Sequence, residues 1–171
     1  MMEYNDFSET PFYKLYTKIS LPYAETPIPI AREMLKMAEA KPGEIVVDLG
    51  CGEGNILIVA AKEFKCIAIG YEIDNGLIKI ARKRIEKLGL KRYIKIFNID
   101  LFKADISNAD IIAVYLTPEI LDILKYKLKR EGKRGLRIVS HDYPISGWRP
   151  RKIGKIIGSK YHIHRIYLYQ L

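Results

Sequence analysis

The sequence predicts an α/β fold built on a mainly parallel sheet. Short apolar runs alternate with segments of helical periodicity along most of the chain, and this alternation is typical of parallel sheets. A glycine-rich loop follows the first apolar run, at 50–54. Two β-rich runs, 152–157 and 162–169, close the chain on either side of Gly158-Ser159, which indicates a hairpin. We therefore expect a seven-stranded sheet with helices on both faces and a C-terminal antiparallel hairpin.

The first helix of the core is expected over 26–39. Thr26 offers a capping side chain, and Pro27 suits the first helical turn. Apolar residues then recur at helical spacing until Lys41-Pro42-Gly43 interrupts the pattern.

The remaining elements follow the same alternation up to the hairpin. We expect strands at 44–48, 66–72, 93–99, 110–116 and 136–141. We expect helices at 54–63, 74–88 and 118–130. Asp74 is expected to cap its helix, and Gly89 to end it. The strand at 93–99 alternates apolar and polar residues, as an edge-side strand should.

The loop after the first strand has the pattern of a ligand-binding loop. Asp48 ends the strand, and Gly50, Gly52 and Gly54 follow at every second position. Glycine lets the backbone turn sharply and approach a ligand, and the next helix begins with free N–H groups and partial positive charge. Open α/β sheets bind ligands at this end of their strands. The spacing differs from the G-x-G-x-x-G of dinucleotide sites. The alternative interpretation is a tight turn without a ligand.

A second acidic residue ends the second strand. Glu72 lies 22 positions after Gly50, close to the ~20-residue offset at which a carboxylate holds ribose hydroxyls. We therefore predict that Glu72 binds a ribose. The alternative is a surface glutamate at a strand end.

Composition indicates one globular domain. The chain has 171 residues, of which 49% are hydrophobic and 29% charged, enough to bury a core. No apolar run approaches the ~20 residues that span a bilayer, and the N-terminus does not resemble a secretion signal. Cys51, Cys66 and the three histidines show no metal-ligand spacing. Cys51 is either a reactive thiol or a small half-buried side chain. We expect a cytoplasmic protein with no metal site and no membrane insertion.

The net charge of +9 comes from 29 basic and 20 acidic residues. Basic residues concentrate at 79–87, 125–137 and 149–155. Such patches attract nucleic acid or acidic proteins, but charged helix faces are also ordinary solvated surface. A thermophilic source would explain the abundance of Ile, Lys and Tyr equally well. Nucleic acid therefore stays open as a partner.

Residues 1–25 are predicted to form an extension ahead of a domain at 26–171. The extension is too aromatic for an inert tail. Its aromatic residues are Tyr4, Phe7, Phe12, Tyr13, Tyr16 and Tyr23. We expect it either to pack over the ligand site or to form a helix that covers one face of the sheet.

Several motifs are spread along residues 20–170. They are Pro22-Tyr23-Ala24-Glu25-Thr26-Pro27, Val47-Asp48-Leu49-Gly50-Cys51-Gly52-Glu53-Gly54, Asn98-Ile99-Asp100-Leu101-Phe102, Asp105-Ile106-Ser107, Val114-Tyr115-Leu116-Thr117, Val139-Ser140-His141-Asp142 and Gly147-Trp148-Arg149-Pro150. The glycine loop resembles that of class I S-adenosylmethionine-dependent methyltransferases. The whole set resembles the small archaeal protein-lysine methyltransferases and their relatives that methylate the mitochondrial ATP-synthase c subunit. Glu25 and Thr117 depart from the more usual apolar residues.

The resemblance implies a Rossmann-like class I methyltransferase fold with S-adenosyl-L-methionine as cofactor. Asp100 would meet the adenine amino group, and Leu101 would pack on the ring; the alternative is a polar loop after a strand. The cofactor-binding residues so implied are Tyr23, Thr26, Asp48, Gly50, Cys51, Gly52, Gly54, Asn55, Glu72, Ile73, Asp100, Leu101 and Tyr115.

The end of the fourth strand bears on the methyl acceptor. Enzymes that methylate adenine or glutamine resemble one another in an Asp/Asn-Pro-Pro-Tyr motif at this point, but this chain has Tyr115-Leu116-Thr117-Pro118. The sequence therefore argues against a planar amino group as the target. It also lacks a cysteine pair suited to C5-pyrimidine chemistry.

A lysine acceptor must be neutral to attack, although free lysine has a pKa near ~10.4. Burial beside a positive sulfur lowers that pKa, so an aromatic wall with a few acceptors is enough for alignment. We predict that Tyr115, His141 and Asp142 are catalytic. Tyr115 could instead be a buried strand residue, and His141 a cap of the sheet. His162 and His164 share one face of a predicted strand and are interpreted as surface or structural.

The sequence thus predicts an S-adenosylmethionine-dependent protein-lysine N-methyltransferase that acts on a protein with an accessible lysine. The sequence leaves the oligomeric state open, with a monomer favoured. An RNA methyltransferase is the second interpretation. A noncatalytic nucleotide-binding module is the third.

Overall fold

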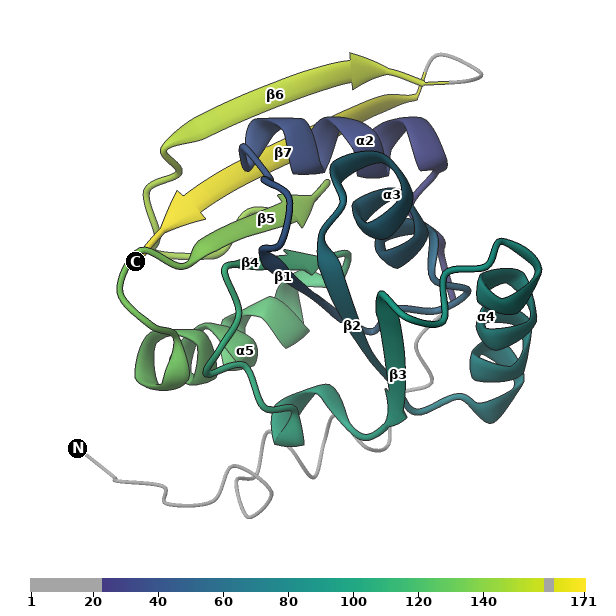
Figure 1. Cartoon of the computed structure of the whole chain (residues 1–171). Helices are drawn as coiled ribbons and strands as arrows, with labels where there is room; N and C mark the ends of the chain where they lie inside the picture. The colour runs from purple at the N-terminus through teal and green to yellow at the C-terminus, as the bar shows by residue number, and fades with distance from the viewer. Residues whose placement is uncertain (1–22, 159–161) are drawn as a thin grey trace.

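The computed structural model describes residues 23–158 and 162–171. One sheet runs through the molecule, and helices cover both of its faces (Figure 1). The strands are β1 (Ile45–Leu49), β2 (Ile67–Glu72), β3 (Ile94–Asn98), β4 (Ile111–Val114), β5 (Arg137–His141), β6 (Lys152–Ile157) and β7 (Ile163–Gln170). The helices are α2 (Ile28–Met37), α3 (Asn55–Phe64), α4 (Asn75–Lys87) and α5 (Pro118–Glu131), with a 3-10 turn η2 (Leu101–Lys103).

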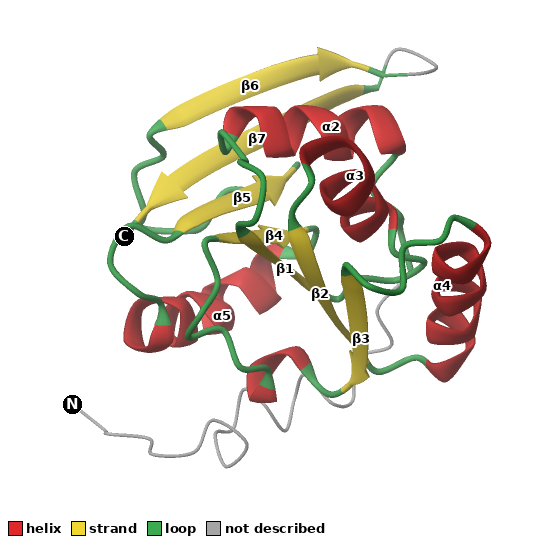
Figure 2. Cartoon of the chain, viewed as in Figure 1, coloured by secondary structure: helices red, strands yellow, loops and turns green. Residues whose placement is uncertain are grey.

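The strands lie in the order β3-β2-β1-β4-β5-β7-β6 (Figure 2). Neighbours from β3 to β5 pair in parallel, whereas β7 pairs antiparallel with both β5 and β6. β1 and β4 are adjacent although β2 and β3 lie between them in sequence. The chain therefore reverses its direction of winding between β1 and β4, and open sheets bind ligands at such a point.

Each face of the sheet has its own hydrophobic core. Val46 of β1 packs into the core under α2 and α3, whereas Val47 packs into the opposite core with α5. Both valines are at most 1% exposed. A strand that is buried on both faces has a continuous apolar sequence, because the side chains on both faces are shielded from water. This explains why β1 and β4 lack the polar alternation of an edge strand.

The predicted α/β fold is confirmed, with element ends shifted by a few residues. The mainly parallel sheet and the C-terminal hairpin are both present. Asp74 caps α4 as predicted, because its side chain accepts hydrogen bonds from the N–H groups of Gly76 and Leu77. The turn residues 159–161 lie outside the described residues. So do residues 1–22, on which most of the predicted extension falls.

One local prediction is wrong. Thr26 does not cap the first helix, since α2 begins at Ile28 with Pro27 at the N-cap position and without a side-chain cap. The Thr26 hydroxyl lies 3.1 Å from Nδ1 of His141 instead. The Thr26 hydroxyl therefore contacts buried His141 of β5, and not the first turn of α2 as the local sequence pattern predicts.

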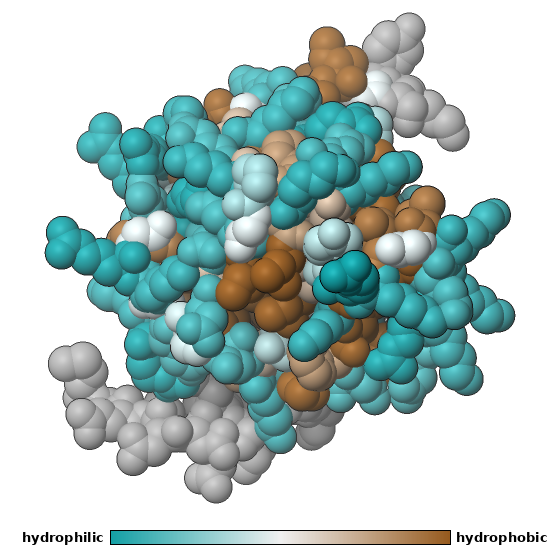
Figure 3. Space-filling view, in the orientation of Figure 1, coloured by the Kyte–Doolittle hydropathy of each residue, from teal (hydrophilic) through white to brown (hydrophobic). Residues whose placement is uncertain are grey.

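The face of the molecule drawn in Figure 3 is largely polar. Figure 3 shows hydrophilic side chains over most of one face, with apolar side chains exposed near its middle. In the basic stretch at 125–137, Lys125 pairs with Asp122 and Lys133 with Asp110, so part of its charge is neutralised locally. Within residues 23–158 and 162–171, every helix falls short of the length and apolar character needed to cross a bilayer.

Gly70 provides a test of how tightly the loop after β1 packs on β2. A Cβ on Gly70 would lie 2.6 Å from both Cys51 Sγ and Leu57 Cδ1. We expect Gly70→Ala to lower the free energy of unfolding by about 1–3 kcal/mol, the usual cost of overpacking, as measured by urea denaturation. Gly76→Ala is the control, because there an added Cβ meets only the Asp74 carboxylate. That variant should be neutral or stabilised by up to ~1 kcal/mol through helix propensity. Equal stabilities of the two variants would contradict the prediction.

Candidate functional site

A pocket lies at the carboxyl ends of β1 and β4, where the winding of the sheet reverses. It encloses about 310 Å³, part of it open to solvent. Its walls come from the segment before α2, the loop between β1 and α3, the start of α3 and the end of β4. The lining residues are Tyr23, Ala24, Glu25, Thr26, Asp48, Gly50, Cys51, Gly52, Glu53, Asn55, Ile56 and Tyr115.

The glycine loop takes a backbone conformation that favours glycine. Gly50, Gly52 and Gly54 have φ values of 82°, 50° and 81°, in the left-handed region that is strained for residues with a Cβ. A Cβ on Gly52 would also lie 2.6 Å from Cε2 of Tyr23. The N–H of Gly50 donates to the carbonyl of Tyr71 at 2.9 Å. The loop is therefore hydrogen-bonded to the end of β2, and glycine at position 52 lets the Tyr23 ring approach the backbone closely.

Asp48 is a buried carboxylate that faces the pocket. It is only 3% exposed, and its carboxyl group makes no hydrogen bond to another described residue. Burial, with a smaller contribution from the negative charge of Glu72, raises the pKa of Asp48 to about 8. Because an unpaired buried carboxylate is costly, a cationic or hydrogen-bond-donating ligand would be favoured at this position.

Glu72 binds the backbone of the glycine loop. Its carboxylate accepts hydrogen bonds from the N–H groups of Gly52 at 2.9 Å, Ile73 at 2.9 Å and Asp74 at 3.0 Å. Asn98 of β3 donates to the carbonyls of Glu72 and Ile73 at 3.0 and 3.1 Å. The ends of β2 and β3 and the loop after β1 are thus held as one unit.

Asn55 opens α3 and connects three segments. Its Nδ2 donates to Oε2 of Glu25 at 3.1 Å and to the carbonyl of Thr26 at 3.0 Å. Its Oδ1 accepts a hydrogen bond from Arg84 of α4 at 2.7 Å. Since Asn55 is buried, these bonds hold the segment before α2 against the glycine loop and close one side of the pocket.

Most of the predicted cofactor-binding residues line this pocket. Those that do not are Gly54, Glu72, Ile73, Asp100 and Leu101. Asp100 and Leu101 follow β3, where Oδ1 of Asp100 accepts a hydrogen bond from the N–H of Phe102 at 2.9 Å. Leu101 is buried, whereas Ile73 is 57% exposed. Two pairs of predicted residues therefore lie outside the pocket lining. They are Glu72 with Ile73 at the end of β2, and Asp100 with Leu101 after the end of β3.

The three residues predicted to be catalytic lie together at the ends of β4 and β5. The ring centroids of Tyr115 and His141 are 4.0 Å apart, and the Tyr115 hydroxyl donates to Oδ2 of Asp142 at 3.3 Å. His141 is 0% exposed, and burial lowers its pKa to about 4. Of the three, only Tyr115 lines the pocket. Thr26 joins the group to the pocket through its contact with His141.

Asp142 has an unusual backbone for a residue other than glycine. Its φ of 61° lies in the left-handed region, and its Oδ1 accepts the N–H of Arg165 at 2.9 Å. Burial would raise its pKa, but the Arg165 N–H and the neighbouring histidines outweigh burial and hold the pKa below its ordinary value. Such strain concentrates at functional sites.

The three histidines of the chain meet around Asp142. His141 Nε2 lies 2.9 Å from His164 Nδ1, and His162 Nε2 lies 3.4 Å from Asp142 Oδ2. The antiparallel pairing of β5 with β7 brings them together. Sequence reasoning missed His164 because spacing does not reveal which strand β7 pairs with. The only signal was that His162 and His164 share one face.

Other lining residues were also not predicted. They are Ala24, Glu25, Glu53 and Ile56, all neighbours in sequence of predicted ones. Cys51 is 6% exposed, and burial raises the pKa of its thiol. The interpretation of Cys51 as a small buried side chain is therefore favoured over that of a reactive thiol.

Comparison with known proteins identifies one family. Residues 48–152 match the ANTKMT methyltransferase domain. The chain is 39% identical over 150 residues to a protein-lysine N-methyltransferase of Saccharolobus islandicus, covering 87% of this chain and 92% of that protein. It is 32% identical over 137 residues to the ATP synthase c-subunit lysine N-methyltransferase of Xenopus laevis, covering 80% of this chain. The chain spans 59% of the length of that Xenopus protein.

A solved structure gives the same architecture. The crystal structure of an RNA methyltransferase from Salinibacter ruber in complex with S-adenosyl-L-homocysteine matches with a TM-score of 0.81 and 32% identity. The match covers 86% of this chain and 93% of that one. A protein with the same fold along nearly its whole length thus binds the demethylated form of S-adenosylmethionine.

The raised pKa of Asp48 predicts how stability depends on pH. Between its ordinary value of 3.8 and about 8, folded Asp48 keeps a proton that the unfolded chain has lost, so wild-type stability falls as the pH rises. Asp48→Asn removes this dependence. We expect its melting temperature, without ligand, to exceed that of the wild type increasingly from pH 5 to pH 8, by at least ~2–4 °C at pH 8, the shift that ~1 kcal/mol produces in a domain of this size.

The control for this prediction is Asp122→Asn, whose carboxylate is half exposed on α5. The melting temperature of Asp122→Asn should differ from that of the wild type by the same amount at every pH. A constant difference between Asp48→Asn and the wild type across the range would show that Asp48 is not a buried, protonated acid.

Proposed function

We propose, because this chain belongs to the ANTKMT methyltransferase domain family, that it is an S-adenosylmethionine-dependent protein-lysine N-methyltransferase. One observation supports the proposal most strongly. The buried carboxyl group of Asp48 stands beside a glycine-rich loop, in a pocket at the point where the sheet reverses its winding. Burial disfavours the charged form of Asp48, so a cationic ligand that stabilises the carboxylate suits this pocket, and the glycines let the backbone approach it closely.

The residues of the pocket fit the cofactor in both shape and charge. When bound, S-adenosylmethionine supplies a methyl group on a positively charged sulfur. We propose that Asp48 and the glycine loop hold the charged end of the cofactor, and that Tyr23 and Asn55 close the pocket over it. We assign Glu72 to the ribose hydroxyls, since two carboxylate oxygens suit a vicinal diol. Asp100 and Leu101 are proposed for the adenine, further along the same edge.

We assign the methyl acceptor to the side of the pocket formed by Tyr115. Its ring forms a wall of the pocket and its hydroxyl donates to Asp142. A lysine ammonium that enters here would meet acceptors at the Tyr115 hydroxyl oxygen and at the Asp142 carboxylate behind it. These acceptors would orient the amine, and burial would lower its pKa so that the neutral form becomes accessible. Alignment of this kind contributes up to ~7–11 kcal/mol to lowering a reaction barrier.

We propose that the enzyme works as a monomer in the cytoplasm on a protein with an exposed lysine. We further propose that residues 26–171 form the catalytic domain, with 1–25 as an extension that serves the same site. Tyr23, which contributes to the pocket wall, supports this role for the extension.

RNA methylation is the second candidate function. The Salinibacter ruber structure that resembles this chain is named an RNA methyltransferase, and the net charge of +9 favours polyanionic partners. The lysine acceptor remains our first choice because a relative with 39% identity, above the 32% of the RNA methyltransferase, is named for lysine methylation.

Labelling distinguishes the two functions. Purified protein is incubated with methyl-labelled S-adenosylmethionine and, separately, an archaeal protein extract or bulk RNA. We expect label in protein, located on lysine Nζ by mass spectrometry, and none in RNA above the level of an Asp48→Asn control. Label that enters RNA and never lysine would overturn the proposal.

Tyr115→Phe tests the acceptor side of the site. The variant keeps the ring but removes the hydroxyl that donates to Asp142. We expect S-adenosylhomocysteine affinity, measured by calorimetry, to stay within about twofold. We expect kcat to fall by about tenfold to a hundredfold, because a hydrogen bond to a charged group is worth ~1.5–3 kcal/mol. Tyr126→Phe, which removes a hydroxyl on the exposed surface of α5, is the control. Unchanged kcat in Tyr115→Phe would remove its hydroxyl from the proposed mechanism.

A further inference from the structure

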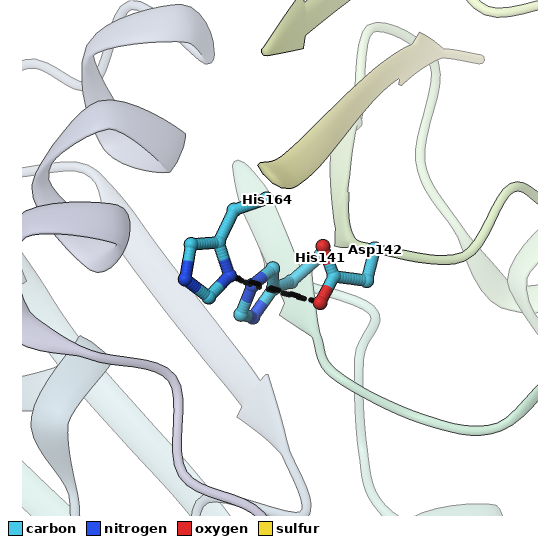
Figure 4. A group of neighbouring side chains, drawn as sticks. All are labelled: His141, Asp142 and His164. Atoms are coloured by element: carbon cyan, nitrogen blue, oxygen red, sulfur yellow. Dashed lines mark hydrogen bonds and ion pairs between the residues drawn. The ribbon is translucent and has the colours of Figure 1, made fainter. Parts of the chain in front are cut away.

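His141, Asp142 and His164 form a compact group of potential metal ligands. Figure 4 shows the three side chains converging from the end of β5 and the start of β7. Their ligand atoms lie within 4.8 Å of one another. Two imidazole nitrogens and one carboxylate oxygen are a donor set that zinc and related transition metals favour over magnesium or calcium.

The distances within the group match those of a zinc coordination sphere. His141 Nε2 lies 2.9 Å from His164 Nδ1, and Oδ2 of Asp142 lies 3.4 and 3.7 Å from these two atoms. Zinc bonds of about 2.0–2.1 Å in a tetrahedron separate the ligand atoms by roughly 3.3 Å. The observed distances bracket that value, so an ion fits with small side-chain shifts.

In two of the three ligands, the side-chain atom that would not contact the ion already has a hydrogen-bond partner. Thr26 Oγ1 lies 3.1 Å from Nδ1 of His141, and the Arg165 N–H donates to Oδ1 of Asp142 at 2.9 Å. Hydrogen bonds of this kind orient metal ligands and set the histidine tautomer. The left-handed backbone of Asp142, φ 61°, turns its carboxylate toward the histidines.

The two histidines can bind an ion without a net loss of protons. The proton between His141 Nε2 and His164 Nδ1 belongs to one imidazole, and both nitrogens must be free to bind a metal. A neutral imidazole can carry its single proton on its other nitrogen. His141 would then donate from Nδ1 to Thr26, and His164 would carry its proton on Nε2. No proton need leave the protein.

We propose that His141, Asp142 and His164 form a site for a divalent transition-metal ion of the zinc class. The ion has three protein ligands and one open position. It would join the end of β5 to the start of β7 and so fix the rim next to Tyr115. Nothing in this inference requires methyl transfer, so it stands or falls separately from the proposed function.

Calorimetry on the full chain tests the site. Protein treated with a chelator and then freed of it is titrated with ZnCl2, and separately with MgCl2. We expect one Zn²⁺ per chain, a higher melting temperature with Zn²⁺, and no response to Mg²⁺. With CoCl2 in place of zinc, we expect the intense visible absorption of tetrahedral Co²⁺ with nitrogen and oxygen ligands. This spectrum needs no variant and therefore does not depend on the folding of any mutant.

Variants locate the ion. Asp142→Asn suits the left-handed backbone, and His164→Ala truncates a largely buried ligand; each should weaken Zn²⁺ binding about a hundredfold or more, since loss of even an outer-shell partner costs ~10–100-fold. His162→Ala is the matched control, because His162 is exposed and contacts the same carboxylate but lies outside the ligand group. It should bind within about threefold of the wild type.

Three results would overturn the proposal. They are the absence of Zn²⁺ binding by the wild type, binding that Asp142→Asn and His164→Ala leave unchanged, and binding that His162→Ala weakens as much as His164→Ala. The second result would indicate adventitious surface binding, and the third a different set of ligands. Circular dichroism of each variant establishes that lost binding is not lost folding.

Discussion

The site is organised around a carboxyl group, that of Asp48, buried at the end of β1. The carboxyl group of Asp48 is almost fully enclosed and makes no hydrogen bond to another described residue, so its ionisation there is costly. Its pKa rises to about 8 for the same reason. A ligand that brings positive charge converts this cost into binding free energy. The glycine loop lines the same pocket and takes a left-handed backbone conformation that residues with a Cβ rarely adopt.

The segment 23–26 connects the two halves of the proposed site. Glu25 and Thr26 bind Asn55 at the start of α3, beside the glycine loop. The hydroxyl of Thr26 reaches His141, which stacks on Tyr115. A displacement of this segment would therefore disturb the cofactor side and the acceptor side together. The proposed metal group continues the same chain of contacts from His141 to the start of β7.

The two halves of the site differ in how much of them could be predicted. Asp48, the glycines and Glu72 lie within 25 residues, at two strand ends and in one loop. Their spacing in the sequence was therefore enough to predict the cofactor side of the site. The acceptor side depended on resemblance to a family, since Tyr115 and His141 stand on different strands. His164 was interpreted as surface or structural, although its Nδ1 lies beside His141. Its partner depends on the pairing of β5 with β7, which local pattern does not encode.

The sequence by itself determined the order of strands and helices, the cofactor loop and the family, because periodicity, glycine spacing and strand-end acids are local properties. Only the tertiary structure decided what the polar side chains do at the rim. It brought the Thr26 hydroxyl to His141 instead of the helix. It also placed His141 of β5, His164 of β7 and His162, just before β7, around Asp142. The reason is physical: a buried polar group takes the partner that folding places beside it, and that partner can lie more than a hundred residues away.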